Sequence, residues 1–233
     1  MKKFFIICLL LAVVSCSKEK QGNMIVQGQI KGLKKATLYL QKMKDTLVIS
    51  VDSISLFGND TFRLVDNIDS PEMYYLTFDT NTSEKRIMFF AEQGTITIND
   101  DVANFGVDTE IEGSSNQKVF DDYKKITSKF QNKQLDLMKA NFDAQKEKNL
   151  KKSDSLRKVS ESEVTRRYLY SINFALAHPD SEATPYIVLT DLVNANIKYL
   201  DTINNSLTDR VKSSFYGKKL DKFIADIKKS EGN

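Results

Sequence analysis

The amino-acid sequence predicts an α+β fold, in which an N-terminal antiparallel β-sandwich or barrel of about eight strands is followed by a C-terminal helical module. Two observations carry this prediction. From Met24 to about Glu112 apolar and polar residues mainly alternate, which is typical of strands. After Gly113 the apolar residues recur at helical spacing. We therefore expect a β-domain over residues 24–113 and a helical module over residues 114–233.

The N-terminus has the features of a bacterial lipoprotein signal. A cationic start is followed by an uncharged apolar run, Phe4 to Val14, which is too short to span a bilayer as a helix. The sequence Val13-Val14-Ser15-Cys16 resembles a lipobox, in which the cysteine thiol receives a diacylglycerol and the chain is cut just before it. This resemblance implies a signal peptide over residues 1–15, a lipid anchor carrying fatty acids such as palmitate on Cys16, and a polar tether over residues 16–23.

The alternative is an ordinary secretory signal with a chance cysteine. Ordinary cleavage prefers a small-x-small pattern, and Val13 is not small, so we favour the lipoprotein interpretation. Cys8, the other of the two cysteines, would leave with the signal. With Cys16 lipidated, the mature chain would have no free thiol and no possible internal disulfide, which excludes CxxC redox chemistry, cysteine nucleophiles and zinc–thiolate sites.

The charge balance argues against a nucleic-acid partner. The formal charge is +3, and two of the 34 basic residues, Lys2 and Lys3, belong to the expected signal, which leaves 32 basic and 31 acidic residues. A net charge of +1 gives no electrostatic footprint for a phosphate backbone.

Eight segments of the β-domain are expected to form strands, because each is rich in β-branched or aromatic residues. Turn residues separate them, for example Lys44-Asp45, Gly58-Asn59-Asp60 and Gln93-Gly94. The expected strands are residues 24–30, 36–43, 46–54, 60–65, 73–79, 85–92, 94–100 and 108–113.

The helical module is expected to contain four helices. Ser114 with Gln117 forms a capping box that predicts a helix from residue 114 to about 149. A second helix is expected over 153–177, with Val159 among its inward residues, and Pro179 ends it. Thr184 and Pro185 predict the N-cap and first position of a third helix. A fourth helix is expected to start at Ser206 and to be interrupted at Gly217.

Four stretches resemble a family of uncharacterised domains, the domain of unknown function 4369. They are "IVQGQIKGLKKATLYL", "VDSISLFGNDTFRLVDNIDSPEMYYLTF", "FFAEQGTITI" and "IEGSSNQKVFDDY". The resemblance implies a Bacteroidota lipoprotein, because domains of this family occur in such lipoproteins. They commonly precede a thioredoxin-like module of the TlpA or peroxiredoxin type. "HPDSEATPYIVL" and "SFYGKKLDKFI" resemble the connecting segment of those proteins. Two departures stand out: a glycine expected soon after Phe62 is absent, and the sequence ends about where the thioredoxin-like module would begin.

No residue is predicted to be catalytic, to bind a metal or to hold a cofactor. His178 lacks neighbouring metal ligands, and Asn99-Asp100-Asp101 lacks the spacing of a calcium loop, so both are expected to be structural or solvated. Glu110 and Glu112 share a strand face, where paired carboxylates are usually solvated. A hydrolase would need two facing carboxylates in a pocket, and the sequence identifies no such pair.

Four short Asp-Ser/Thr-aliphatic sequences resemble the O-glycosylation sequon of exported Bacteroidota proteins. The candidate acceptors are Thr46, Ser53, Ser155 and Thr202.

These observations predict a non-enzymatic protein, lipid-anchored in the cell envelope, with a binding or scaffolding role and an envelope protein as a possible partner. The alternative is an accessory of a thioredoxin-like thiol–disulfide oxidoreductase, acting in trans. We expect the outer rather than the inner membrane, and the side of that membrane stays open.

Replacing Cys16 with serine tests the anchor. We expect Cys16→Ser to remain unprocessed and to incorporate no radiolabelled palmitate, because the hydroxyl cannot replace the thiol in lipid transfer. Cys8→Ser serves as the control and should be labelled normally. Normal processing and labelling of Cys16→Ser would contradict the lipoprotein interpretation.

Overall fold

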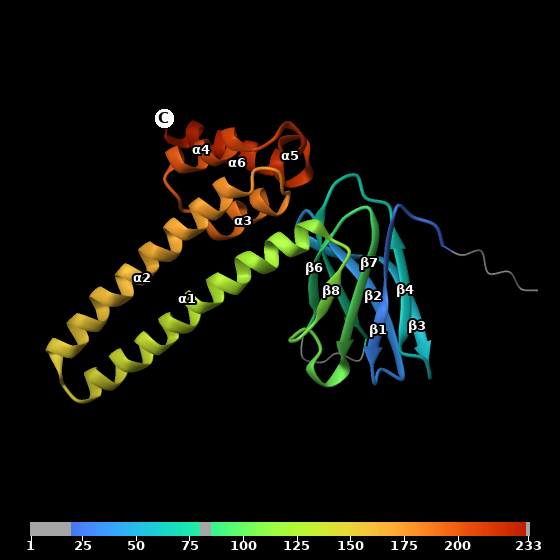
Figure 1. The fold of residues 1–233 in the computed structure, drawn as a ribbon, viewed down its shortest axis with the longest axis horizontal. Helices are drawn as coiled ribbons and strands as arrows, with labels where there is room; N and C mark the ends of the chain where they lie inside the picture. The colour runs from blue at the N-terminus through green and yellow to red at the C-terminus, as the bar shows by residue number, and fades with distance from the viewer. Residues whose placement is uncertain (1–19, 80–84, 232–233) are drawn as a thin grey trace, which may run out of the picture.

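The computed structural model describes residues 20–79 and 85–231 (Figure 1). The expected signal peptide and Cys16 lie outside the described residues. Part of the expected tether lies inside them and already belongs to the β-domain. The Asn23 side chain accepts a hydrogen bond from the Ile68 N–H and donates one to the Ile68 carbonyl, both at 2.8 Å. Lys20 forms an ion pair with Asp52.

The β-domain is a sandwich of two four-stranded sheets, which confirms the predicted fold class. One sheet has the order β4-β1-β7-β8 and the other β3-β2-β5-β6. Seven strands follow the expected ranges closely, and β8 is reduced to three residues. The bounds are β1 Met24–Lys31, β2 Lys35–Lys44, β3 Leu47–Phe57, β4 Thr61–Asp66, β5 Glu72–Phe78, β6 Ile87–Ala91, β7 Gly94–Asp101 and β8 Glu110–Glu112.

One strand pair differs from the antiparallel prediction. β1 and β7 pair in parallel, with Val26 opposite Ile96 and Gly28 opposite Ile98. Alternation of apolar residues shows which face of a strand is buried but not the direction of its neighbour, so the sequence pattern could not reveal this pairing.

The two sheets enclose one apolar core, and a buried carboxylate also joins them. Val26, Leu40, Leu64 and Ile96 are fully buried between the sheets. Asp52 lies in β3 directly beside a bulge in the β2–β3 pairing, and its side chain is only 7% exposed. Its Oδ2 accepts a hydrogen bond from the Val65 N–H of β4 at 2.9 Å, which links the edges of the two sheets.

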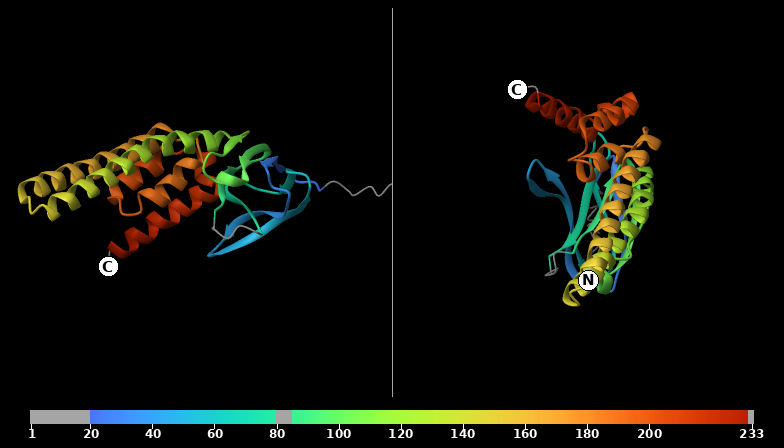
Figure 2. Two further views of the ribbon diagram at one scale, coloured as in Figure 1. Left: turned by 90° about the horizontal axis from the view of Figure 1, so that it is seen from below. Right: turned by 90° about the vertical axis from the view of Figure 1, so that its left-hand side faces the viewer.

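Two long helices form a hairpin that extends away from the sandwich, and four shorter helices lie against the base of that hairpin (Figures 1 and 2). A single-turn helix, η1 (Val102–Asn104), follows β7. The helical bounds are α1 Ser115–Lys146, α2 Leu150–Ala177, α3 Ala183–Asp191, α4 Ile197–Ser206, α5 Asp209–Ser213 and α6 Phe215–Glu231.

Several details of the helix prediction are wrong. The N-cap of α3 is Glu182, and Thr184 lies inside the helix, where its hydroxyl donates to the His178 carbonyl. Ser206 ends α4, a helix that the prediction missed, and Thr208 is the N-cap of α5. Gly217 lies within α6 rather than at a break. Val159 faces outward and is 42% exposed, because the distal hairpin has no third layer to bury it.

Asn116 fastens the helical module to the sandwich. It is buried, and its amide uses all four of its hydrogen-bonding positions. Its Nδ2 donates to Glu92 at 2.8 Å and to Glu182 at 3.0 Å. Its Oδ1 accepts from the Ser181 hydroxyl at 2.7 Å and from the Ala183 N–H at 3.1 Å. One side chain therefore joins the end of β6, the start of α1 and the start of α3.

Gln117, the next residue, binds a backbone N–H on the edge strand of a sheet. Ser114 caps α1 by accepting from the Gln117 N–H, as predicted. The Gln117 side chain does not reach back to complete the capping box. Its Oε1 instead accepts from the Phe90 N–H of β6 at 2.8 Å. Because β6 is an edge strand, this bond covers a backbone donor that would otherwise be unpaired.

Aromatic rings fill the rest of the junction. Phe90 of β6 meets Phe120 of α1 and Tyr186 of α3 edge-to-face, with ring centroids 5.5 and 5.4 Å apart. Tyr216 of α6 also contacts Tyr186, and its hydroxyl accepts from the Met73 N–H at 3.0 Å. Such ring pairs stabilise beyond the area they bury, so the junction is a packed core rather than a flexible link.

Removal of the Asn116 amide tests this junction. We expect Asn116→Ala to lower the free energy of unfolding by about 2–4 kcal/mol, because the buried Glu182 carboxylate loses a donor and two other groups lose an acceptor. Urea denaturation followed by circular dichroism measures the change. Asn132→Ala, at an exposed position of the same helix, is the matched control and should stay within about 0.5 kcal/mol. Equal stability of the two variants would contradict this account of the junction.

Candidate functional site

An apolar strip runs along the distal half of α1. Leu135, Met138 and Phe142 are 62%, 60% and 57% exposed. Their spacing of three and four residues places them on one side of the helix. Large apolar side chains at this exposure are normal when scattered, but a continuous row marks an interaction surface. We call Leu135, Met138 and Phe142 the apolar strip.

The strip continues a helix face that is covered elsewhere. Nearer the sandwich, the same side of α1 carries Phe120 and Thr127, which are buried. There Phe120 packs against Phe90 and Tyr186. Beyond Thr127 the described helices leave this side of α1 open, as the extended hairpin in Figure 1 shows. The fold therefore buries one half of a continuous helix face and exposes the other.

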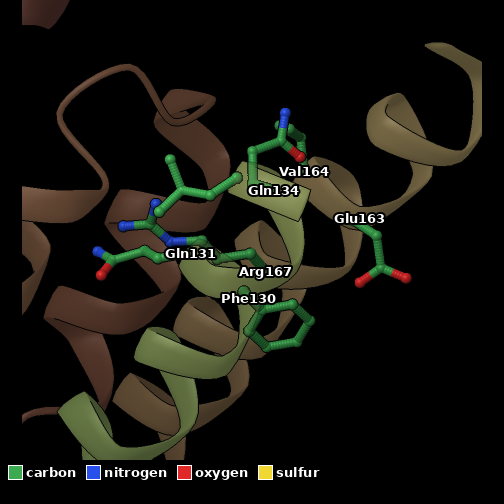
Figure 3. Close-up of a pocket in the computed structure, with 7 residues that line it drawn as sticks. Phe130, Gln131, Gln134, Glu163, Val164 and Arg167 are labelled. Carbon is green, nitrogen blue, oxygen red and sulfur yellow. The ribbon is translucent and has the colours of Figure 1, made fainter. Parts of the chain in front are cut away.

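A groove between α1 and α2 opens beside the strip (Figure 3). Its volume is about 420 Å³. The apolar walls are Phe130 and Leu135 from α1 and Val164 from α2. Polar side chains complete the lining: Gln131, Gln134, Glu163 and Arg167. Leu135 belongs to both the groove and the strip, so the two form one surface.

The inner end of the groove is held by a hydrogen-bonded network. Arg167 donates to Asp191 of α3 at 3.1 Å, and the Tyr123 hydroxyl donates to the same carboxylate oxygen at 2.7 Å. Burial raises the pKa of the Tyr123 hydroxyl, so it remains a donor at neutral pH. Since this network joins α1, α2 and α3, the groove has a fixed wall and a preorganised shape.

One polar atom in the groove lacks a partner. The Gln134 Nε2 donates to the Ser160 hydroxyl at 2.6 Å, whereas its Oε1 is buried and accepts no hydrogen bond. Buried polar atoms are usually satisfied. This oxygen has almost no accessible surface, so the groove exposes the rest of the Gln134 side chain and not its unpaired acceptor.

Charge is divided between the two parts of the chain. Residues 24–113 include 8 basic and 14 acidic residues, a net charge of −6, whereas residues 114–233 include 22 basic and 16 acidic residues, a net charge of +6. The nearly neutral total conceals this separation. The strip and the groove therefore lie on the basic part of the molecule.

The junction holds a carboxylate pair that the sequence did not reveal. Glu92 and Glu182 both accept from the Asn116 amide, beside a hollow of about 450 Å³. Glu92 also accepts from the Ser115 N–H at 2.7 Å, which caps α1, and Arg210 pairs with Glu182. Structural contacts thus account for both carboxylates. Only the three-dimensional arrangement brings these distant residues together.

A second ionic cluster lies at one end of the sandwich. The Lys42 ammonium donates to the Tyr74 hydroxyl at 2.9 Å, and that hydroxyl donates to Asp66 at 2.7 Å. Glu72 lies 3.8 Å from Lys42, and burial raises the pKa of its carboxyl. These groups satisfy one another across β2, β4 and β5, which is a structural role.

Other residues singled out from the sequence have structural surroundings. His178 stacks on Phe174, and its Nδ1 lies 2.8 Å from the Phe174 carbonyl. Asp100 accepts from the Gly106 N–H and the Thr109 hydroxyl and so closes the loop after β7. Glu110 and Glu112 are exposed on the edge strand β8. Within residues 20–79 and 85–231, no group of three or more His, Cys, Asp or Glu residues could hold a metal ion.

The candidate O-glycosylation acceptors are all exposed, in four different settings. Thr46 lies in the β2–β3 turn, Ser53 in β3, Ser155 in α2 and Thr202 in α4. Exposure is compatible with modification, which stays a prediction. Asp52, the first residue of one of these sequences, is engaged in the link between the sheets.

Polar substitution of the apolar strip tests whether its side chains contribute to the stability of the folded protein. We expect the triple variant Leu135→Gln/Met138→Gln/Phe142→Gln to lose less than about 1 kcal/mol of unfolding free energy, because these side chains are largely exposed. Leu137→Ala, at the buried neighbouring position, should lose about 2 kcal/mol or more. Urea denaturation compares the two. A larger loss in the triple variant than in Leu137→Ala would show that the strip serves folding.

Among the described helices, none is both long and apolar enough to cross a membrane. Comparison with known proteins found one family match, in which residues 24–120 fit the model described as Domain of unknown function (DUF4369). No curated protein and no solved structure matches the chain. The matched segment ends at Phe120, so it covers the whole sandwich and also Asn116, Gln117 and Phe120, the residues of α1 that dock onto it. Residues 24–120 are therefore similar to this family, and the matched segment includes the start of the long helix.

Proposed function

We propose that this protein is a lipid-anchored component of the cell envelope with a non-catalytic binding or scaffolding role, and that the apolar strip and the groove bind a partner protein. The outer membrane is the proposed location. The observation that carries the proposal is the exposed row of Leu135, Met138 and Phe142 beside a preformed groove. A partner that covers these exposed apolar side chains removes them from water, and this stabilises the complex.

The way in which the hairpin is attached to the sandwich supports a binding or scaffolding role. A helix of 32 residues is about 48 Å long. Its base is fixed to the sandwich by Asn116 and Gln117, and its distal half extends beyond the other helices (Figures 1 and 2). The first described residue, Lys20, contacts β3 of the sandwich, at the end of the molecule opposite the hairpin tip. An anchor at Cys16 would thus hold the sandwich near the membrane and leave the strip accessible.

The second candidate is an accessory of a thioredoxin-like oxidoreductase. Its support is the resemblance of the N-terminal domain and of the connecting segment to proteins that carry such a module. On this hypothesis the partner on the strip would be a thioredoxin-like protein, so the identity of the bound protein separates the two candidates.

Site-specific photo-crosslinking in cells tests the proposal. A photo-crosslinking amino acid at Met138 should capture a defined partner, because this side chain lies at the centre of the strip. The matched control carries the same amino acid at Lys129, an exposed position nine residues earlier and therefore on the opposite side of α1. We expect a discrete product at Met138 that is at least tenfold weaker at Lys129.

Two outcomes would contradict the proposal. Equal products at Met138 and Lys129 would mean random encounter, and the absence of any product at Met138 would mean that the strip has no partner. Capture of a thioredoxin-like protein at Met138 would favour the accessory role over a general scaffold.

A further inference from the structure

We infer that the strip and the groove receive an acidic amphipathic helix of the partner protein. This inference rests on the proposed function and names the chemistry of the partner. From Gln131 to Phe142 the surface is about 16 Å long, or three helical turns. Leu135, Met138 and Phe142 occupy positions i, i+3 and i+7 of α1, beside the groove between α1 and α2. An apolar row of this spacing next to an interhelical groove fits the apolar face of a third helix.

The charge beside the strip is basic. At about 100° per residue around the helix, Lys139 and Lys146 lie about 60° and 40° from Phe142, whereas Asp136 and Asp143 lie about 120° and 100° away. The Lys146 ammonium lies 4.3 Å from the centroid of the Phe142 ring. Lys139 is exposed and forms no ion pair with another described residue. The row next to the strip therefore offers positive charge to a partner.

The opposite rim of the groove does not cancel this charge. Glu163 is bound by Arg166 at 2.8 Å, and Arg167 is bound by Asp191. Glu161, farther along α2, pairs with Arg157 at 2.8 Å. These three charged groups of α2 are thus engaged within the protein, and the charges nearest the strip are those of the lysines of α1. Acidic residues flanking the apolar face of the incoming helix complement these lysines.

A second copy of this chain fits the surface less well. In a two-fold pairing centred on the strip, residues near the axis meet their own counterparts. Lys139, next to the central Met138, would then approach the Lys139 of the other copy, and like charges repel. A membrane also fits less well, because acyl chains in the groove would bury its polar lining without giving it hydrogen-bond partners.

Charge reversal combined with crosslinking at Met138 tests the inference. In Lys139→Glu/Lys146→Glu we expect the product at Met138 to fall at least tenfold, because the partner's acidic residues then face negative charge. Lys129→Glu/Lys133→Glu, at exposed positions about 140° and 180° around the helix from Phe142, is the matched control and should leave the product within twofold. Mass spectrometry of the crosslinked peptide should identify an apolar helical segment rich in Asp and Glu.

The outcomes separate this inference from the proposed function. A product at Met138 that survives charge reversal, or a crosslinked peptide without acidic residues, overturns the acidic helix and leaves the docking role intact. A product that contains two copies of this chain, or one that consists of lipid, overturns it in favour of self-association or membrane contact. The absence of a product in the unaltered protein overturns both proposals.

Discussion

The direction in which the long helix leaves the sandwich depends on two consecutive amides, Asn116 and Gln117. The Asn116 amide donates to the carboxylates of Glu92 and Glu182 and accepts from two donors at the start of α3. The Gln117 side chain accepts from the Phe90 N–H on the edge of β6. These polar bonds lie beside the ring cluster around Phe90. Apolar packing stabilises the junction without fixing its angle, whereas hydrogen bonds with defined donors and acceptors select one orientation. The family match ends just after these residues, so the docking turn lies inside the segment that the family model matches.

This junction explains why one helix face is half buried and half exposed. Near the sandwich, Phe120 is covered by Phe90 of β6 and Tyr186 of α3, and Thr127 is also buried. Beyond them α1 has only α2 beside it, and the strip of Leu135, Met138 and Phe142 stays open. Stability therefore resides in the sandwich, in the junction and in the four short helices, whereas the distal hairpin supplies surface. Substitutions in the strip should affect binding far more than folding, which is the expected division for a protein that presents a docking site.

Much of the fold could be predicted from the sequence, because alternation and helical spacing report local burial. The eight strands and the Ser114 cap follow from such local patterns. The parallel pairing of β1 and β7 could not be predicted, because the pattern carries no direction. Thr184 resembled an N-cap, yet its hydroxyl binds the His178 carbonyl once the chain folds back. The strip was missed for a similar reason: apolar spacing identifies an amphipathic face but does not say whether another element covers it. The separation of charge into acidic and basic halves was hidden by the nearly neutral total.

The central claim is that the sandwich and the hairpin form one rigid unit, which holds the strip in a fixed place. A spin-label distance measurement tests this most directly, and the chain from residue 17 onward contains no cysteine that would interfere with labelling. The labels are attached at Thr95→Cys in β7 and Ser155→Cys in α2, both at exposed positions. A rigid junction predicts a single narrow distance distribution that broadens when Asn116→Ala is added. A broad or multimodal distribution in the otherwise unaltered protein would contradict the account, because the helical module would then move independently of the sandwich.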